Sequence, residues 1–162
     1  MRLAVYTDYP YHRIDGAVYA ERAFAVFLAA LAEEVGGLKV IGRLDPTPTH
    51  GRYPLGESVS LVGLPHYQRL SDPGPAIRGM AGAITRFWRA MDDIDCIWIL
   101  GPHPLAFAFA LLARIRGKPV VLGVRQQSPE YIRHRHPGRR AFLAAAIAMQ
   151  SGFRWLGRFF PV

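Results

Sequence analysis

The sequence places side chains capable of chemistry directly after three apolar runs. An imidazole can move a proton, a guanidinium can bind a phosphate or a carboxylate, and a glycine lets the backbone approach a phosphate closely. The candidates that follow these runs are Tyr11, His12 and Gly16 near the amino terminus, His103 in the middle of the chain, and Arg125 and Gln126 further on.

His103 is the strongest single candidate for a catalytic residue. It lies in Gly101-Pro102-His103-Pro104, between the apolar run 95–100 and an apolar helix pattern that begins at Leu105. A nearly continuous apolar strand indicates burial on both faces, as in a parallel sheet, and ligands bind in the crevice beyond the carboxyl ends of such strands. The alternative is that His103 is an ordinary solvated loop side chain.

The first polar segment, 8–16, offers Tyr11 and His12 as substrate-binding residues and Gly16 as a phosphate-binding position. We expect Gly16 to lie just before a helix that starts at Ala17, where bare backbone amides and the helix dipole bind anions. Neither GxGxxG nor a P-loop is present. Gly16 could equally be only a loop-to-helix junction.

Arg125 and Gln126 begin the third polar segment, immediately after an apolar run. A guanidinium at the edge of the crevice suits a phosphate or a carboxylate. Arg125 could instead pair with Glu130 or Asp15. His134 and His136 have no cysteine or carboxylate residues near them at the spacing of metal ligands, so we predict no metal site.

The elements that must position these residues alternate between short apolar runs and helical patterns. Strands are expected at 3–7, 38–44, 58–64, 95–100 and 120–124, and helices at 17–35, 76–91, 105–116 and 139–160. Ile77, Met80, Ile84 and Phe87 are predicted to form the buried face of the second helix. This order predicts an α/β fold, a Rossmann-like, doubly wound, mostly parallel sheet.

Composition narrows the possible partners. The chain has 162 residues, 51% of them hydrophobic, and a net charge of +8, which favours anionic partners. The basic residues form no stripe with interleaved aromatics, so nucleic acid is not expected. The single cysteine rules out disulfides within the chain. The amino terminus has no apolar core of a signal peptide, so a cytoplasmic location is expected.

The last segment, 139–160, combines aromatic residues with Arg139, Arg140, Arg154 and Arg158. Such a basic amphipathic helix could lie on an anionic membrane surface, or it could pack against the sheet or a further domain. We therefore divide the chain into a Rossmann-like domain at 1–138 and this helix at 139–162, and the lack of a closing element suggests truncation.

One family resemblance rests on two features. The first is the opening strand followed by the Gly16 segment and a long helix, and the second is DCIWILGPHPLAFAFALLARIRGKPVVLGVRQ at 95–126. With the order of elements between them, these features resemble the amino-terminal half of GT-B fold glycosyltransferases, specifically the retaining family 4. The resemblance covers nearly the whole chain and lies in pattern more than in single residues.

The resemblance implies a domain on the acceptor side of an enzyme that transfers a sugar from a nucleotide-sugar to a glycan, lipid or small molecule, without a metal or a resident cofactor. It also implies Gly16 near the donor phosphates and His103 and Arg125 in the cleft. Two positions depart from the family: Ala17 follows Gly16 where many members have a second glycine, and Arg125-Gln126 stands where many have His-Asp. The family's donor-binding domain, with its Glu-x7-Glu signature, has no counterpart in the sequence, so the chain is expected to be inactive alone.

Two other functions compete with this one. A nucleotide-dependent oxidoreductase would be expected to carry GxGxxG and an acidic residue after the second strand, where only Asp45 stands. A non-catalytic Rossmann-like binding module, or a subunit that docks on a membrane, fits the same pattern of elements.

Overall fold

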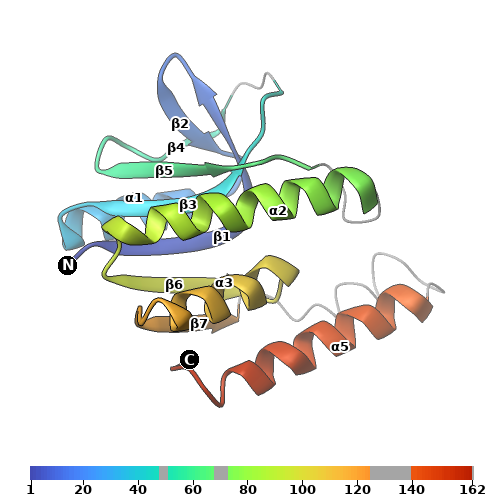
Figure 1. Cartoon of the computed structure of the whole chain (residues 1–162). Coiled ribbons are helices and arrows are strands. Elements are labelled where there is room, and N and C mark those ends of the chain that lie inside the picture. The colour runs from blue at the N-terminus through green and yellow to red at the C-terminus, as the bar shows by residue number, and fades with distance from the viewer. Residues whose placement is uncertain (48–50, 68–72, 125–139, 162) are drawn as a thin grey trace.

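The computed structural model describes residues 1–47, 51–67, 73–124 and 140–161. In these ranges the chain forms seven strands, four α-helices and a short 3₁₀ helix (Figure 1). They are β1 (Leu3–Ile14), β2 (Ala17–Ala20), α1 (Phe24–Val35), β3 (Leu38–Leu44), β4 (Tyr53–Pro54), β5 (Val59–Leu64), α2 (Pro73–Ala90), η1 (Met91–Asp93), β6 (Cys96–Gly101), α3 (Pro104–Ile115), β7 (Val120–Val124) and α5 (Arg140–Leu156).

Five of the strands form a parallel sheet in the order β5-β3-β1-β6-β7. After β1 the chain adds β3 and then β5 on one side of β1, and it later adds β6 and then β7 on the other side. The strand order therefore reverses between β1 and β6. The predicted Rossmann-like, mostly parallel α/β fold is confirmed.

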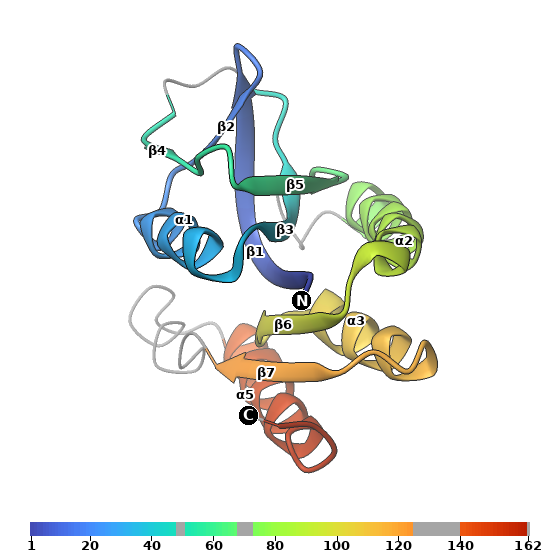
Figure 2. The same ribbon diagram turned by 90° about the vertical axis from the view of Figure 1, so that its left-hand side faces the viewer.

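The sheet is covered on both faces. Ala25, Leu28 and Ala32 of α1 pack on one face. Phe87 of α2 and Phe109 of α3 lie in the core of the other face, together with Phe153 of α5. Figure 2 shows α1 on one side of the strands and α2 and α3 on the other. This arrangement explains why the central strands read as continuous apolar runs.

The segment after the first apolar run differs from the prediction. β1 continues to Ile14 and turns back at Asp15-Gly16 into β2, so the helix starts at Phe24 and not at Ala17. Asp15 and Gly16 both have positive φ, 49° and 86°, which is the backbone of a two-residue hairpin turn. The Asp-Gly pair is itself a hairpin signal, so Gly16 does not lie at a helix amino terminus.

The buried face of α2 also differs from the prediction. Phe87 is fully buried as expected, but Ile77 and Ile84 are 66% and 37% exposed, and the small residues Ala76 and Ala83 are buried in their place. The helix therefore lies close to the sheet. A Cβ on Gly79 would come within 3.0 Å of the Tyr67 ring, and one on Gly82 within 2.8 Å of Pro65.

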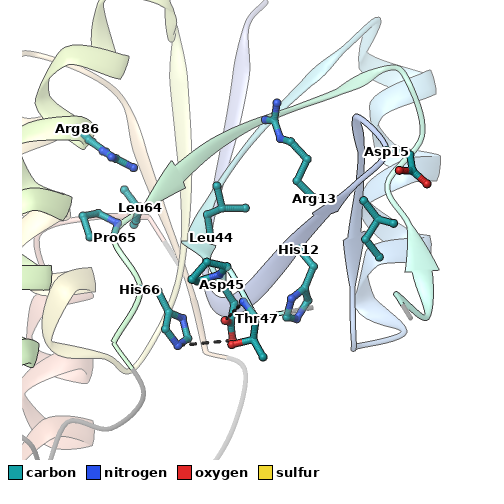
Figure 3. Close-up of a pocket in the computed structure, with 12 residues that line it drawn as sticks. His12, Arg13, Asp15, Leu44, Asp45, Thr47, Leu64, Pro65, His66 and Arg86 are labelled. Carbon is teal, nitrogen blue, oxygen red and sulfur yellow. Dashed lines mark hydrogen bonds and ion pairs between the residues drawn. The ribbon is translucent and has the colours of Figure 1, made fainter. Parts of the chain in front are cut away.

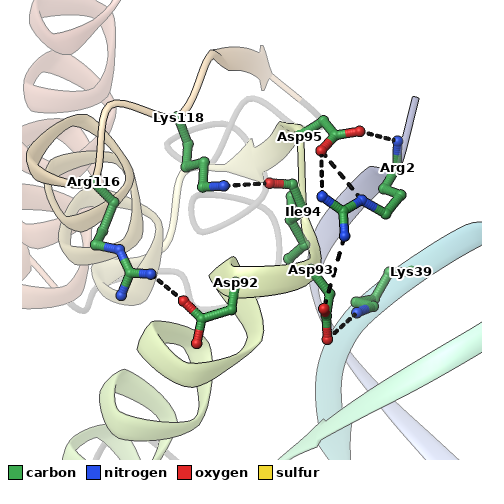
Figure 4. A network of polar contacts seen from close by, with 8 residues as sticks. All are labelled: Arg2, Lys39, Asp92, Asp93, Ile94, Asp95, Arg116 and Lys118. Carbon is green, nitrogen blue, oxygen red and sulfur yellow. Dashed lines mark hydrogen bonds and ion pairs between the residues drawn. The ribbon is translucent and has the colours of Figure 1, made fainter.

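Charged side chains form hydrogen bonds and ion pairs between segments at the amino-terminal edge of the sheet (Figure 4). The backbone N–H of Arg2 and its guanidinium both donate to the Asp95 carboxylate, each at 2.8 Å. Arg116, which follows the last residue of α3, donates to the Asp92 carboxylate, and Lys118 donates to the carbonyl of Ile94 at 2.7 Å. These contacts join the starts of β1 and β6.

The Arg2–Asp95 pair predicts a pH dependence of stability. Hydrogen bonds from the Arg2 side chain and backbone lower the pKa of Asp95 from 3.8 to about 2. Because the folded-state pKa is below the unfolded one, the contribution of the pair is fully present above about pH 4 and is lost as the pH falls towards 2. Asp95→Asn is therefore expected to destabilise the protein modestly at pH 7, with a difference that shrinks below pH 4.

Urea denaturation at a series of pH values measures this difference. Glu34→Gln, which neutralises an exposed carboxylate on α1, is the control and should leave the profile unchanged. An Asp95→Asn difference that stays constant from pH 7 to pH 2 would contradict the assignment.

The carboxyl-terminal helix packs on the core through one face. Ala146, Gln150 and Phe153 are buried, and the Phe153 ring lies where a Cβ on Gly101 would stand. After α5 the chain reaches β7, where the N–H of Leu122 donates to the carbonyl of Pro161 at 2.8 Å.

Within the described residues, no helix combines the length and apolar character needed to span a bilayer. The proposed division of the chain near residue 138 stays a prediction.

Candidate functional site

The carboxyl ends of β1 and β6 meet where the strand order reverses, which is the point at which doubly wound sheets bind ligands. β6 ends at Gly101 and α3 begins at Pro104, so His103 occupies the short connection. Asp8 lies on β1 at the same edge, in an irregular part of the strand. The site is built from these two side chains and their neighbours.

A bulge in β1 positions Asp8. The register with β3 pairs Tyr6 with Ile41 and then Pro10 with Arg43, so residues 7–9 stand opposite the single residue Gly42. Bulges are frequent beside active sites because they redirect side chains. A Cβ on Gly42 would overlap the Tyr11 ring, and therefore only glycine fits opposite the bulge.

His103 caps helix α3 with its side chain. Its backbone is extended, and its Nδ1 accepts a hydrogen bond from the N–H of Leu105 at 3.2 Å, with Pro104 in the first helical turn. The Tyr6 hydroxyl lies 3.0 Å from the same nitrogen. Because Nδ1 accepts from Leu105, the geometry assigns the neutral tautomer with its proton on Nε2.

The Nε2 atom of His103 faces two oxygens. The Tyr67 hydroxyl lies 3.0 Å away and Oδ1 of Asp8 lies 3.2 Å away. His103 is only 4% exposed, so the alternative of a solvated loop side chain is wrong. Burial, and next the Asp8 charge, raise the pKa of Tyr67 above its ordinary value, so its hydroxyl stays protonated at neutral pH.

Arg43 completes the cluster from β3. Its guanidinium donates to the carbonyl of Tyr67 at 2.7 Å and to the carbonyl of Asp8 at 2.8 Å, and it lies 4.7 Å from the centre of the Tyr67 ring. Its Nε is 3.5 Å from Oδ1 of Asp8. The Asp8 carboxylate thus has a guanidinium and an imidazole on its inner side.

Asp8 is the most accessible side chain in this cluster. Its side chain is 28% exposed, compared with 14% for Arg43 and 6% for His103. A carboxylate that has a guanidinium and an imidazole within 3.5 Å on its inner side and is partly open to solvent can accept a hydrogen bond, or a proton, from a ligand hydroxyl. The cluster is therefore suited to bind and polarise a hydroxyl group.

The other predicted site residues lie elsewhere. Tyr11 is 1% exposed in the core on the α1 face, with its hydroxyl 2.6 Å from Oγ1 of Thr7. Gly16 is at the tip of the hairpin, and the helix-terminus basis for its phosphate role is wrong. His12 is buried and lines a pocket together with Asp45 and His66 (Figure 3). Arg125 and Gln126 lie outside the described residues.

The sequence analysis did not select Asp8, Arg43 or Tyr67. Asp8 follows an apolar run and Arg43 interrupts one, and such a polar residue could have been selected from the sequence as a site candidate. Nothing in the sequence around Tyr67 distinguishes it in the same way. Among the described residues, no group of three histidine, cysteine or acidic side chains has a metal-binding arrangement.

Comparisons with known proteins find distant structural similarity and no sequence match. No family model matches the chain, and no curated protein matches it. A crystal structure of UDP-N-acetylglucosamine 2-epimerase aligns with 92% of this chain and 40% of its own, at 15% sequence identity and a TM-score of 0.43. The chain thus spans less than half the length of that protein, and the assignment of a Rossmann-like domain rests on the strand order described above.

Proposed function

We propose that this chain is the acceptor-side domain of a nucleotide-sugar-dependent glycosyltransferase with a GT-B arrangement. The observation that carries the proposal is the Asp8–His103 pair at the reversal point of the sheet. The resemblance of the two sequence segments to family 4 supports the choice of reaction. Asp8 is the residue proposed to contact the acceptor, in place of the direct role first assigned to His103.

In this proposal an acceptor hydroxyl donates a hydrogen bond to the Asp8 carboxylate. When the hydroxyl oxygen bonds to the sugar's anomeric carbon and the nucleotide departs with the electrons of the broken bond, the proton passes to Asp8. His103 and Arg43 fix the carboxylate and stabilise its charge before transfer. His103 is therefore a positioning residue.

The nucleotide-sugar would be a co-substrate held mainly by a second, donor-binding domain outside residues 1–162. No metal or resident cofactor is part of the proposal. The chain 1–162 alone is expected to show no turnover of UDP- or GDP-sugars. Measurable turnover by this chain alone would contradict its assignment as the acceptor half.

Replacing Asp8 with asparagine tests the binding step. We expect NMR titration with neutral methyl glycosides and short oligosaccharides to reveal a saturable ligand that perturbs the signals of residues 8, 43 and 103. Asp8→Asn should weaken the binding of this ligand at least about tenfold, because a hydrogen bond to a charged group contributes about 1.5–3 kcal/mol. Asp15→Asn, at the hairpin tip, is the matched control and should bind as the unmodified chain does. Binding that is indifferent to Asp8→Asn would defeat the proposal.

A second candidate function is docking on an anionic membrane, and exposed aromatic side chains at the end of α5 and in the turn that follows it favour this function. Trp155 and Phe159 are 56% and 52% exposed and contact each other at 4.8 Å between ring centres, next to Arg154 and Arg158. Aromatic side chains flanked by arginine suit the interface of an anionic bilayer.

Sedimentation with phosphatidylserine-containing vesicles tests this docking. Trp155→Ser with Phe159→Ser should release the chain from these vesicles. Val26→Ser on α1, where the replaced side chain is similarly exposed at 57%, should not. Equal binding of both variants, or equal binding to neutral phosphatidylcholine vesicles, would contradict it. Point changes are needed because Phe153 of the same helix is part of the core.

A further inference from the structure

An apolar surface stays open to solvent on the side of the sheet that α2 and α3 cover. The two helices pack against each other, and Figure 1 and Figure 2 show them on the same side of the strands. Single apolar residues are ordinary on a protein surface, but several together on neighbouring helices indicate a site of interaction. We call this surface the α2–α3 face. It consists of Ile77 (66% exposed), Ala81, Ile84 (37%) and Trp88 (37%) of α2, with Leu111 (58%) and Ile115 (65%) of α3.

The outer side of α2 carries larger apolar side chains than part of its inner side does. Ala76 and Ala83 are buried towards the sheet, whereas the neighbouring Ile77 and Ile84 point outward. A helix whose only partner is the core directs its larger apolar residues inward. The outer side of α2 therefore has the composition of a second packing surface.

The α2 residues of this face are spaced as in a helix that pairs with another helix. Ile77, Ala81, Ile84 and Trp88 follow one another at steps of four, three and four residues, which is the a/d spacing of paired helices. This spacing places them in one row along the helix. Ala81 is the smallest member, so the row leaves room between Ile77 and Ile84 for the side chain of a partner helix. The guanidinium of Arg116, just after α3, lies over the Trp88 ring at 4.7 Å and connects the row to the end of α3.

The charge along α2 has a single sign. The helix contains Arg78, Arg86 and Arg89 and no acidic residue. Arg86 is engaged, because it donates to the carbonyl of Gly63. Arg78 and Arg89 are exposed, and within the described part of the chain neither forms an ion pair. They are three helical turns apart, about 16 Å, along the solvent side of the apolar row.

These two features, the spacing and the charge, favour one kind of occupant. A second copy of this chain would bring arginine against arginine, and like charges at an interface oppose binding. An anionic bilayer would attract the arginines but requires no a/d spacing, and Ala81 in the row adds little apolar depth. A helix with an apolar seam and acidic residues three turns apart matches both the row and the two arginines.

We propose that the α2–α3 face binds an acidic amphipathic helix of a partner protein. The apolar seam of that helix packs on the row from Ile77 to Trp88, and its carboxylates pair with Arg78 and Arg89. Helix docking of this kind depends on a few apolar anchors at helical spacing. The site is independent of the glycosyltransferase proposal, because the α2–α3 face shares no residue with the cluster of Asp8, Arg43, Tyr67 and His103.

Fluorescence anisotropy with three labelled peptides tests the chemistry of the partner. A designed peptide of about three heptads, with leucine at a and d and glutamate at e and g, is expected to bind with a dissociation constant below about 100 µM. One matched peptide has lysine in place of each glutamate, and another has serine in place of each leucine. Each should bind at least about tenfold more weakly. An acidic peptide that does not bind, or a lysine peptide that binds as tightly, would overturn the proposal.

Matched variants test the location. Ile77→Ser is expected to weaken binding of the acidic peptide at least about tenfold, whereas Val26→Ser on α1, where the replaced side chain is 57% exposed, should not. Arg78→Gln combined with Arg89→Gln should also weaken it about tenfold. Arg13→Gln combined with Arg22→Gln removes the same charge from exposed positions outside α2 and is the control. Equal losses from the two arginine pairs would show a diffuse effect of net charge and refute the site.

Two further measurements separate this site from the other proposals. Ile77→Ser should sediment with phosphatidylserine-containing vesicles as the unmodified chain does, and its release from them would identify the α2–α3 face as a membrane surface and overturn the proposal. Asp8→Asn should leave binding of the acidic peptide unchanged, so the failure of the proposed function would not affect this result. Circular dichroism melts confirm that each variant folds.

Discussion

Replacing His103 with alanine is expected to lower the free energy of unfolding by about 3 kcal/mol and to abolish glycoside binding at Asp8. The imidazole serves three groups at once on its Nδ1 and Nε2 sides: the N–H of Leu105, the Tyr6 hydroxyl and the Tyr67 hydroxyl. Alanine removes the helix cap and leaves two buried hydroxyls without this partner. Urea denaturation followed by circular dichroism measures the stability, and NMR titration measures the binding.

His103→Asn separates the cap from the cluster. Asparagine is among the best helix-capping residues, so its side chain should again accept from Leu105 and recover about 1 kcal/mol of the loss. It is too short to reach both Tyr67 and Asp8, and glycoside binding should remain lost. If asparagine restored binding as well as stability, His103 would be a helix cap and nothing more.

Replacing Phe109 with alanine is expected to cost about 3–5 kcal/mol, the largest effect on stability among the substitutions considered. Phe109 is fully buried, its ring stacks on Phe87 at 4.0 Å between centres, and its edge contacts Tyr6 at 4.8 Å. The cavity left by alanine would lie beneath both aromatic neighbours. Thermal and urea unfolding measure the loss.

The control for Phe109 lies on the same helix. Leu111 is 58% exposed, and Leu111→Ala should change the free energy of unfolding by about 0.5 kcal/mol or less. Because Tyr6 packs on Phe109 and hydrogen-bonds His103, Phe109→Ala should also weaken glycoside binding. Similar costs for the two alanine variants would contradict the central position assigned to Phe109.

The parallel part of the fold could be predicted because burial on both faces gives each central strand an unbroken apolar run. β3 and β7 have the predicted boundaries, 38–44 and 120–124, and β6 differs by one residue at each end. The hairpin could not be obtained in the same way. Its strands contain Tyr, Pro, His and Arg, a composition typical of loops. The Asp15-Gly16 turn was therefore interpreted as the end of a loop just before a helix.

The candidate site was predictable only in part, because it depends on packing between distant segments. His103 was selected correctly as a residue at the carboxyl edge of the sheet, since a strand and a helix flank it directly. Its partner Asp8 depends on a bulge opposite Gly42, and no local pattern encodes that register. Tyr67 reaches the cluster because Gly79 of α2 leaves room for its ring.

The contact between Leu122 and Pro161 bears on how the molecule behaves among its own copies. β7 is the last strand on its side of the described sheet, and a free outer strand offers unpaired N–H and C=O groups to any neighbouring chain. The segment after α5 occupies one of these donors, and Phe159, Phe160 and Pro161 lie beside Val120 and Val121 of the strand. The residues that follow α5 therefore cover part of the edge along which another strand could add, and this makes growth of the sheet by strand pairing at β7 less favourable.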